Sequence, residues 1–197
     1  MGAIIEMIGA FMIAALLTLL VLQMQVNAYQ TDANSKYTFS LQAHSSVFKE
    51  VMRSHIKSAG FNLTDFENVI VVVEPSEMRF LTDLDDDGLP DTISVEVKAY
   101  ETDEDPTPMN PLDKAIVITT NGVQETVEVY GVTDFAFAYF DVDNTPTTLP
   151  ADVRIVGFSY KMLSREPLSY DRSDTDPLNY AMSIAEERVF LKNVWDW

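Results

Sequence analysis

One acidic stretch of the sequence, TDLDDDGLPDTIS, carries residues whose types and spacing suit a metal ion. Its carboxylates follow the arrangement D-x-D-x-D-G-x-x-D, with acids at Asp83, Asp85, Asp87 and Asp91. In calcium-binding loops, alternate carboxylates converge on one ion, and a glycine, here Gly88, permits the sharp turn. The backbone oxygen of Leu89 is a further candidate ligand, because Ca²⁺ takes six to eight oxygen atoms. The pattern predicts a calcium-type loop at 83–94, with Ca²⁺ as the expected cofactor.

The loop departs from an EF-hand at its twelfth position, where Ser94 replaces the usual bidentate Glu. Ser94 and Glu96 are candidates for additional metal ligands. We expect a loop between two strands, with the weak affinity of extracellular calcium modules, rather than a pair of EF-hand helices. A bound cation would order the hairpin and stabilise the head by linkage. The alternative is a solvated acidic turn, because an Asp-Asp-Gly tract also favours turns without metal.

Residues suited to catalysis are scarce in this chain. It has no Cys, and therefore no disulfide, thiolate ligand or thiol nucleophile. Its two histidines, His44 and His55, are eleven residues apart on a predicted helix, or about 16 Å, which is too far to share a metal ion. The sequence holds no glycine-rich phosphate loop, HExxH motif or nucleophile elbow. We do not expect an enzyme.

The net charge of the chain argues against one class of partner, the nucleic acids. The chain has 31 Asp and Glu against 13 Lys and Arg, a formal charge of −18. Such a surface repels nucleic-acid phosphates, so no nucleic-acid partner is expected. The same balance suits an extracellular surface, a divalent cation or a saline habitat.

The acidic loop needs strands on either side to position it. Short runs rich in β-branched and aromatic residues follow Gly60, and we predict that they are these strands and the rest of a sheet. These runs cover 66–73, 77–83, 91–101, 114–120, 123–131, 132–140, 153–163 and 186–194. Between two of them, Asn121-Gly122 predicts a type I′ hairpin turn. The remaining connections include acidic loops at 101–111 and 171–177, expected to be exposed, and a plain turn at 141–144.

One of the predicted strands carries an aromatic stripe. Phe135, Phe137 and Tyr139 alternate onto one face of the run VTDFAFAYF. We expect these rings to pack in the core against a helix rather than to form a ligand platform.

The start of the chain favours an apolar helix. From Met7 to Leu22 the only residues outside the strongly apolar set are Gly9 and Thr18. The run from Ile4 to Val26 is long enough to cross a bilayer core of about 30 Å.

The helical pattern continues beyond this apolar run, because no Pro precedes Pro75 and no Gly lies between Gly9 and Gly60. An apolar stripe with helical spacing comprises Val47, Phe48, Val51, Met52, Ile56 and Ala59. Gly60 supplies a left-handed C-terminal stop, and Phe61 is expected to pack back on the helix. The prediction is a helix of about 55 residues, or about 80 Å, apolar all round in its first half and amphipathic in its second.

The expected fold class is therefore α+β, a long N-terminal helix packed on an antiparallel β-sheet head. Its parts are a transmembrane or filament-core half at 1–27, an amphipathic half at 28–60 and a β-rich head at 61–197. Glu6 is the unusual residue, because a charge in hydrocarbon costs several kcal/mol unless it lies at the interface or is paired.

This combination resembles the type IV pilin superfamily. In that family a long N-terminal helix is first a membrane anchor and then the core of a filament, and its outer half packs under a small β-rich head. The family's hallmark is a glutamate at the fifth position of the mature chain, which Glu6 takes if the mature chain begins at Gly2. The resemblance implies that Glu6 pairs with the N-terminal ammonium of a neighbouring subunit, so that its buried charge is satisfied.

The order of the segments indicates which subgroups of the superfamily the chain resembles. The helix ends VMRSHIKSAGFN, and the head then runs through VTDFAFAYFDVDN, LPADVRIVGFSYKMLSRE and RVFLKN. This order is similar to that of the W-type minor pilins and the J-type pseudopilins of type II secretion. Members of that group typically sit at or near the filament tip and prime assembly.

The resemblance implies a structural subunit of an extracellular type IV pilus-like or pseudopilus filament, of the minor or tip type. Its partners would be other pilin subunits, in a homo- or heteropolymer. Its location would be a bacterial-type cell membrane before assembly and a cell-surface filament afterwards.

Two other interpretations of the apolar start stay open. In the first, the chain is a single-pass anchored, calcium-stabilised surface domain that does not polymerise, with Glu6 at the membrane interface. In the second, a signal peptide ending VNA is cleaved after Ala28 and leaves a secreted domain. Signal peptides begin with basic residues, whereas here no Lys or Arg precedes Lys36.

Overall fold

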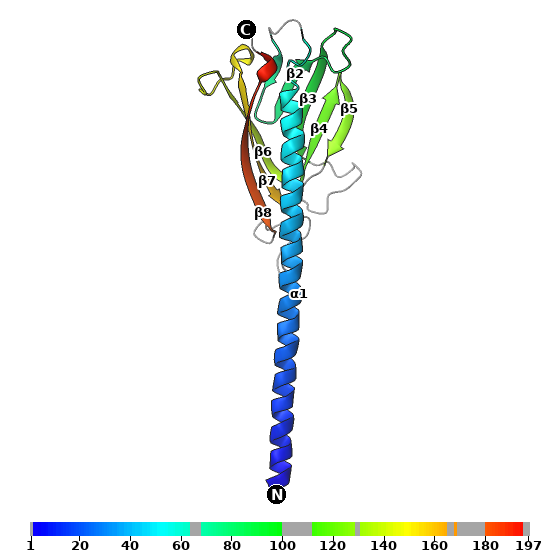
Figure 1. The fold of residues 1–197 in the computed structure, drawn as a ribbon, viewed down its shortest axis with the longest axis vertical. Coiled ribbons are helices and arrows are strands. Elements are labelled where there is room, and N and C mark those ends of the chain that lie inside the picture. Colours follow the sequence, from blue (N-terminus) through cyan, green and yellow to red (C-terminus); the bar gives the residue numbers. More distant parts are fainter. Residues whose placement is uncertain are drawn as a thin grey trace.

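The computed structural model describes residues 2–63, 68–99, 112–128, 131–164, 168 and 180–194, with the backbone alone for 125–128. Within these residues the chain has the predicted α+β fold, one long N-terminal helix and antiparallel sheets that form a head (Figure 1).

The helix α1 is unbroken from Gly2 to Lys57, so its 56 residues extend over about 84 Å. Its second half lies against the head, whereas its first half projects away from it and ends at the N-terminus (Figure 1). The absence of Pro from this stretch explains the continuity. Within the apolar half, the hydroxyl of Thr18 donates to the carbonyl of Ala14 at 2.8 Å, so this polar group is satisfied inside the helix.

The described strands of the head form a five-stranded and a three-stranded sheet. The first sheet has the order β1 (Ile70–Val73), β2 (Glu77–Thr82), β3 (Asp91–Ala99), β4 (Lys114–Thr120) and β5 (Val123–Glu128). The second has the order β6 (Val132–Phe140), β7 (Ile155–Leu163) and β8 (Met182–Phe190). Two 3₁₀ helices, η1 (Pro150–Asp152) and η3 (Lys192–Val194), follow β6 and β8. Every paired strand is antiparallel to its neighbour, and within each sheet the strands pair in chain order.

The predicted hairpin turn is confirmed. Asn121 and Gly122 join β4 to β5 with φ angles of 53° and 78°, and Thr120 pairs with Val123 across them. Two consecutive positive φ angles are what a type I′ turn requires, and Asn-Gly adopts them at little cost.

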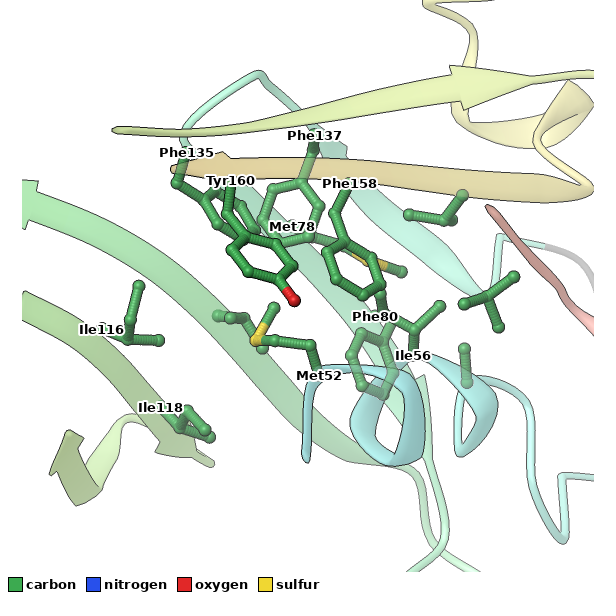
Figure 2. Packing of buried hydrophobic residues seen from close by; sticks show 14 of the residues in the cluster. Met52, Ile56, Met78, Phe80, Ile116, Ile118, Phe135, Phe137, Phe158 and Tyr160 are labelled. Carbon is green, nitrogen blue, oxygen red and sulfur yellow. The ribbon is translucent and has the colours of Figure 1, made fainter. Parts of the chain in front are cut away.

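The core lies where α1 meets both sheets (Figure 2). The helix contributes Phe48, Met52 and Ile56, all fully buried, and the ring of Phe48 packs edge-on against Tyr160 with centroids 4.9 Å apart. Around them lie Met78, Phe80, Ile116, Ile118 and Phe158 from the sheets. The predicted burial of Phe135, Phe137 and Tyr139 is confirmed. Edge-on aromatic pairs of this kind stabilise a core beyond the area that they bury.

The buried stripe of the helix is narrower and longer than predicted. It comprises Leu41, Ser45, Phe48, Met52 and Ile56, a single row at spacings of three and four, which continues to Ala59 beyond the helix. Val47 is 54% exposed, because it lies off this row. Ser45 is polar yet buried, and its hydroxyl lies 3.0 Å from that of Tyr160. The helix therefore contacts the sheets along one ridge.

The helix ends at the predicted place by a different mechanism. Gly60 has a φ of 75°, as expected of a left-handed stop, but its N–H donates to Leu81 of β2 at 2.8 Å and not back to the helix. Phe61 is 48% exposed, so the expectation that it packs back on the helix is wrong. The chain leaves the helix along β2, and this route carries Phe61 outward.

The last strand lies four residues earlier than predicted. β8 covers Met182–Phe190, pairing with β7 from Leu163 opposite Met182 to Ile155 opposite Phe190, whereas the prediction was 186–194. Residues 192–194 form η3, which packs at the end of the long helix. The predictions for 66–67, 100–111, 129–130 and 171–177 lie outside the described residues.

Candidate functional site

No other part of the described chain packs against the apolar half of α1. Its most apolar 18-residue window has a mean hydropathy of 2.5 and none of it is buried, and Leu41 is the first buried residue of the helix. The segment is long and apolar enough to cross a membrane. Such a surface is stable only in lipid or against other apolar surfaces, since the area exposed to water would be large.

Glu6 and Gly2 both lie on this exposed segment. Glu6 is the only charged residue between Gly2 and Thr31, and the first cationic side chain, Lys36, is thirty residues further along the helix, or about 45 Å. A partner for Glu6 in an apolar environment must therefore come from the N-terminus of a chain or from another molecule. The structure brings Gly2 and Glu6 to the same end of the helix, one turn apart.

The acidic loop joins β2 to β3, as expected from the sequence. Asp83 follows the last residue of β2, Asp91 is the first residue of β3, and Thr82 pairs directly with Asp91. This register brings the two carboxylates together at the mouth of the loop. One oxygen from each of Asp83, Asp85 and Asp91 lies within 4.8 Å of the others. The loop thus gathers three of the four predicted carboxylates.

Backbone N–H groups hold the two ends of the loop. Asp83 Oδ2 accepts from the Gly88 N–H at 3.1 Å, and Asp91 Oδ2 accepts from the Leu84 N–H at 2.9 Å. Gly88 adopts a φ of 82°, which closes the turn toward Asp83 and favours glycine. The hydrogen bond from Leu84, followed by one from the Asn121 side chain, lowers the pKa of Asp91, so this carboxylate stays charged.

Asp83 differs from the other acids of the loop in its burial. The residue is 2% exposed, and its Oδ1 is buried without a hydrogen-bond partner among the described residues. The ion pairs that the described residues form include none with Asp83, Asp85 or Asp91. A buried carboxylate oxygen with neither a donor nor a cation is costly, and Ca²⁺ is the kind of ion that such oxygen clusters hold.

The other predicted ligands lie outside this group. Asp87 Oδ1 accepts from the Leu89 N–H at 2.8 Å, which fixes a local turn. The Ser94 hydroxyl donates to Glu77 Oε1 at 3.1 Å, and Glu96 forms an ion pair with Lys98 at 3.0 Å. Both Ser94 and Glu96 are therefore engaged with neighbours on the sheet.

Two asparagines support the loop and were not anticipated from the sequence. Asn121 donates to Asp91 Oδ1 at 2.7 Å, and Asn62 donates to Asp86 Oδ1 at 3.3 Å. Asn121 belongs to the β4–β5 turn and Asn62 to the turn that follows α1. The sequence predicted the turn at Asn121-Gly122 but not its contact with the acidic loop. Only the pairing of β3 with β4 shows that this turn lies beside Asp91.

The turn at 141–144 shows how a similar acid is satisfied without metal. Asp141 Oδ1 accepts from the N–H groups of Asp143 and Thr145, at 2.9 and 2.8 Å. Both donors belong to the same short turn, as the sequence predicted for this segment. Asp83 Oδ1 has no equivalent donor among the described residues.

Comparison of the chain with protein-family models, curated proteins and solved structures finds no match in any of the three. The resemblance to type IV pilins thus rests on the residues and the order of elements given above.

Proposed function

We propose that this protein is a structural subunit of a type IV pilus-like or pseudopilus filament. In this proposal the apolar half of α1 is a transmembrane anchor before assembly and part of a helical filament core afterwards. The β-rich head is carried on the outside of the filament, and the partners are other pilin subunits.

The observation that carries the proposal is the division of one helix between two environments. The stripe from Leu41 to Ile56 is buried in the head, while the apolar residues before it are exposed on all sides of the helix. A simple membrane anchor needs about 20 apolar residues. It does not need to continue as one unbroken helix into the head. Here the helix continues without a break from Gly2 into the core, so a helix bundle of several copies would position each head at a fixed height.

Glu6 supports polymerisation over simple anchoring. Its charge near the start of an apolar run costs free energy unless it is paired, and the chain offers no Lys or Arg before Lys36. The N-terminal ammonium of a neighbouring subunit would satisfy Glu6 and also set the axial register between copies. We infer a minor or tip subunit from the likeness of the segment order to the W-type pilins and J-type pseudopilins.

The experiment compares Glu6→Ala and Glu6→Gln with the wild-type chain in the native host. The wild-type protein should appear in sheared filaments, whereas both variants should remain in the membrane fraction at normal abundance. Thr18→Ala is the matched control, because it also removes a polar group from the apolar run without touching Glu6. Equal recovery of all four proteins from the membrane and none from filaments would instead support the anchored, non-polymerising surface domain.

The mass of the N-terminal peptide separates the remaining possibilities. A chain that begins at Gly2, particularly with a methylated amine, would place Glu6 at the fifth position and support pilin-type maturation. A chain that begins at Tyr29 would overturn the filament proposal, since no apolar helix would be left to assemble.

A further inference from the structure

We propose that the β2–β3 loop binds one Ca²⁺ ion through Asp83, Asp85 and Asp91, and that this ion fastens the loop to the end of the long helix. The site is independent of the filament proposal, so either can fail alone.

The first observation is the convergence of the three carboxylates. Their oxygens lie within 4.8 Å of one another, which is the spacing of ligands around a single ion of this size. Three negative charges at this separation repel each other, and the described residues supply no Lys or Arg to offset them. A divalent cation would turn this repulsion into attraction.

The second observation is independent of charge clustering. Asp83 is 98% buried, its Oδ2 is occupied by the Gly88 N–H, and its Oδ1 has no partner among the described residues. A solvated acidic turn does not require a buried carboxylate, and Asp141 shows that an acid in a turn can be satisfied by backbone N–H groups. Asp83 Oδ1 is therefore the oxygen left over for an ion.

The hard oxygen donors of the loop select the class of ion. The described group contains carboxylates and no His, so Zn²⁺ and other nitrogen- or sulfur-preferring ions are poor candidates. Three carboxylates leave several positions for backbone oxygens and water, which suits the higher coordination number of Ca²⁺ better than the strict octahedron of Mg²⁺. The affinity expected of such a site is that of extracellular modules, a Kd of about 0.1–1 mM.

The loop is tied to two other segments, and this gives the ion a structural role. The Asp83 N–H donates to Phe61 O at 2.9 Å, and Asn62 donates to Asp86, so the loop is bonded to the residues just after α1. Asn121 bonds Asp91 from the β4–β5 turn. Ca²⁺ would thus hold together the helix exit, the β2–β3 loop and the β4–β5 turn, all at the end of the head farthest from the N-terminus.

The test uses the full chain in detergent micelles, with unfolding of the head followed by near-ultraviolet circular dichroism of its packed aromatic rings. At 10 mM Ca²⁺ the midpoint of thermal unfolding should rise by about 5 °C over the same protein in EDTA at matched ionic strength. Isothermal calorimetry should find one ion per chain. Mg²⁺ at the same concentration should produce a clearly smaller shift.

Asp85→Asn is the main variant, because Asp85 is exposed and its loss should not prevent folding. It should reduce the Ca²⁺ shift to about half or less, while Asp143→Asn, which removes the same charge from another exposed turn, should retain it in full. Equal shifts in both variants, or equal shifts with Mg²⁺, would mean general screening of an acidic protein and would overturn the site.

Amide hydrogen exchange gives a second measurement that needs no variant. Ca²⁺ should slow exchange at Leu84 and Gly88, whose N–H groups donate to Asp91 and Asp83, by at least about tenfold at saturation. Exchange at Asp143 should not change. Loop exchange that is indifferent to Ca²⁺ would contradict the proposal.

Discussion

Gly60 and Asn193 lie so close together that a Cβ atom on Gly60 would meet the carbonyl oxygen of Asn193 at 2.6 Å. The Asn193 side chain also donates to the carbonyls of Lys57 and Ala59, at 3.1 and 3.4 Å. These are carbonyls that a helix end leaves without partners inside the helix. The last described segment of the chain therefore caps the long helix that begins it, and Gly60 permits the approach.

Gly60→Ala should destabilise the head by about 2–4 kcal/mol, because the new methyl group meets a backbone atom and Ala is disfavoured at a φ of 75°. Urea unfolding of the full chain in micelles measures the loss. Gly122→Ala is the control, since Gly122 has a φ of 78° but open space around its Cβ position. It should cost about 1 kcal/mol, and an equal loss in both variants would show that the contact with Asn193 is unimportant.

A second contact fixes the rotation of the helix against β8. Glu187 accepts ion pairs from Lys49 Nζ at 3.0 Å and from Arg53 Nη2 at 3.5 Å, one helical turn apart on α1. Its side chain is 18% exposed, while both cations remain about 40% exposed. Water screens these pairs in part, so their joint contribution is modest.

Glu187→Gln should reduce the free energy of unfolding by about 1 kcal/mol at low salt and by less at 1 M NaCl. Glu186→Gln removes the same charge from the opposite face of β8, where Glu186 is 66% exposed. That control should change stability by less than about 0.5 kcal/mol in either direction. A larger effect for Glu186 than for Glu187 would contradict the role of the helix–strand pairs.

The long helix and most strands could be predicted because their signals are local. Apolar composition, the absence of Pro and the alternation in runs such as VTDFAFAYF act on the residues that carry them. The predicted range for β8 starts four residues late, because the ends of this strand are set by its pairing with β7, from Met182 to Phe190, and not by a local pattern. Its charges are tolerated because Glu186 and Arg188 point outward and Glu187 meets the helix.

The same distinction applies to the acidic loop. The D-x-D-x-D-G spacing indicated an ion site and a turn at Gly88, and both Asp83 and Asp91 lie at its mouth. Burial of Asp83 and the support from Asn62 and Asn121 depend on how the helix exit and the β4–β5 turn pack beside the loop. Contacts between segments so distant in sequence leave no local pattern.

The stability of the head should depend on pH through Asp113, a residue that belongs to none of the motifs found in the sequence. It lies just before β4, is 8% exposed, and its Oδ1 has no hydrogen-bond partner among the described residues. Burial raises the pKa of Asp113 to about 7. The folded state therefore binds this proton more tightly than the unfolded chain does. The resulting stability is complete below about pH 4 and is lost as the pH rises toward 7.

Asp113→Asn should remove this dependence, because the amide imitates the neutral acid. At pH 8 the variant should be more stable than the wild-type chain, and near pH 4 the two should differ little. Between these values their difference should change by at most about 1.4 kcal/mol per pH unit. Asp134→Asn, at a 76% exposed side chain, is the control and should give a difference that does not vary with pH in this way. If the difference in unfolding free energy between Asp113→Asn and the wild-type chain stayed the same at every pH, protonation of Asp113 would not be linked to folding.

Within the acidic loop, the structure and the spacing of the sequence make different predictions for Asp87. The spacing treats Asp87 as a ligand equal to Asp85, whereas its Oδ1 accepts from the Leu89 N–H and it lies outside the convergent group. Asp85→Asn should therefore raise the Kd for Ca²⁺ by at least about tenfold, and Asp87→Asn by about threefold or less, through lost long-range charge alone. Calorimetric titration of both variants in the full chain measures the two constants. An equal or larger loss for Asp87→Asn would mean that the loop closes around the ion with all the alternate carboxylates, and that the bound geometry is the one indicated by the spacing.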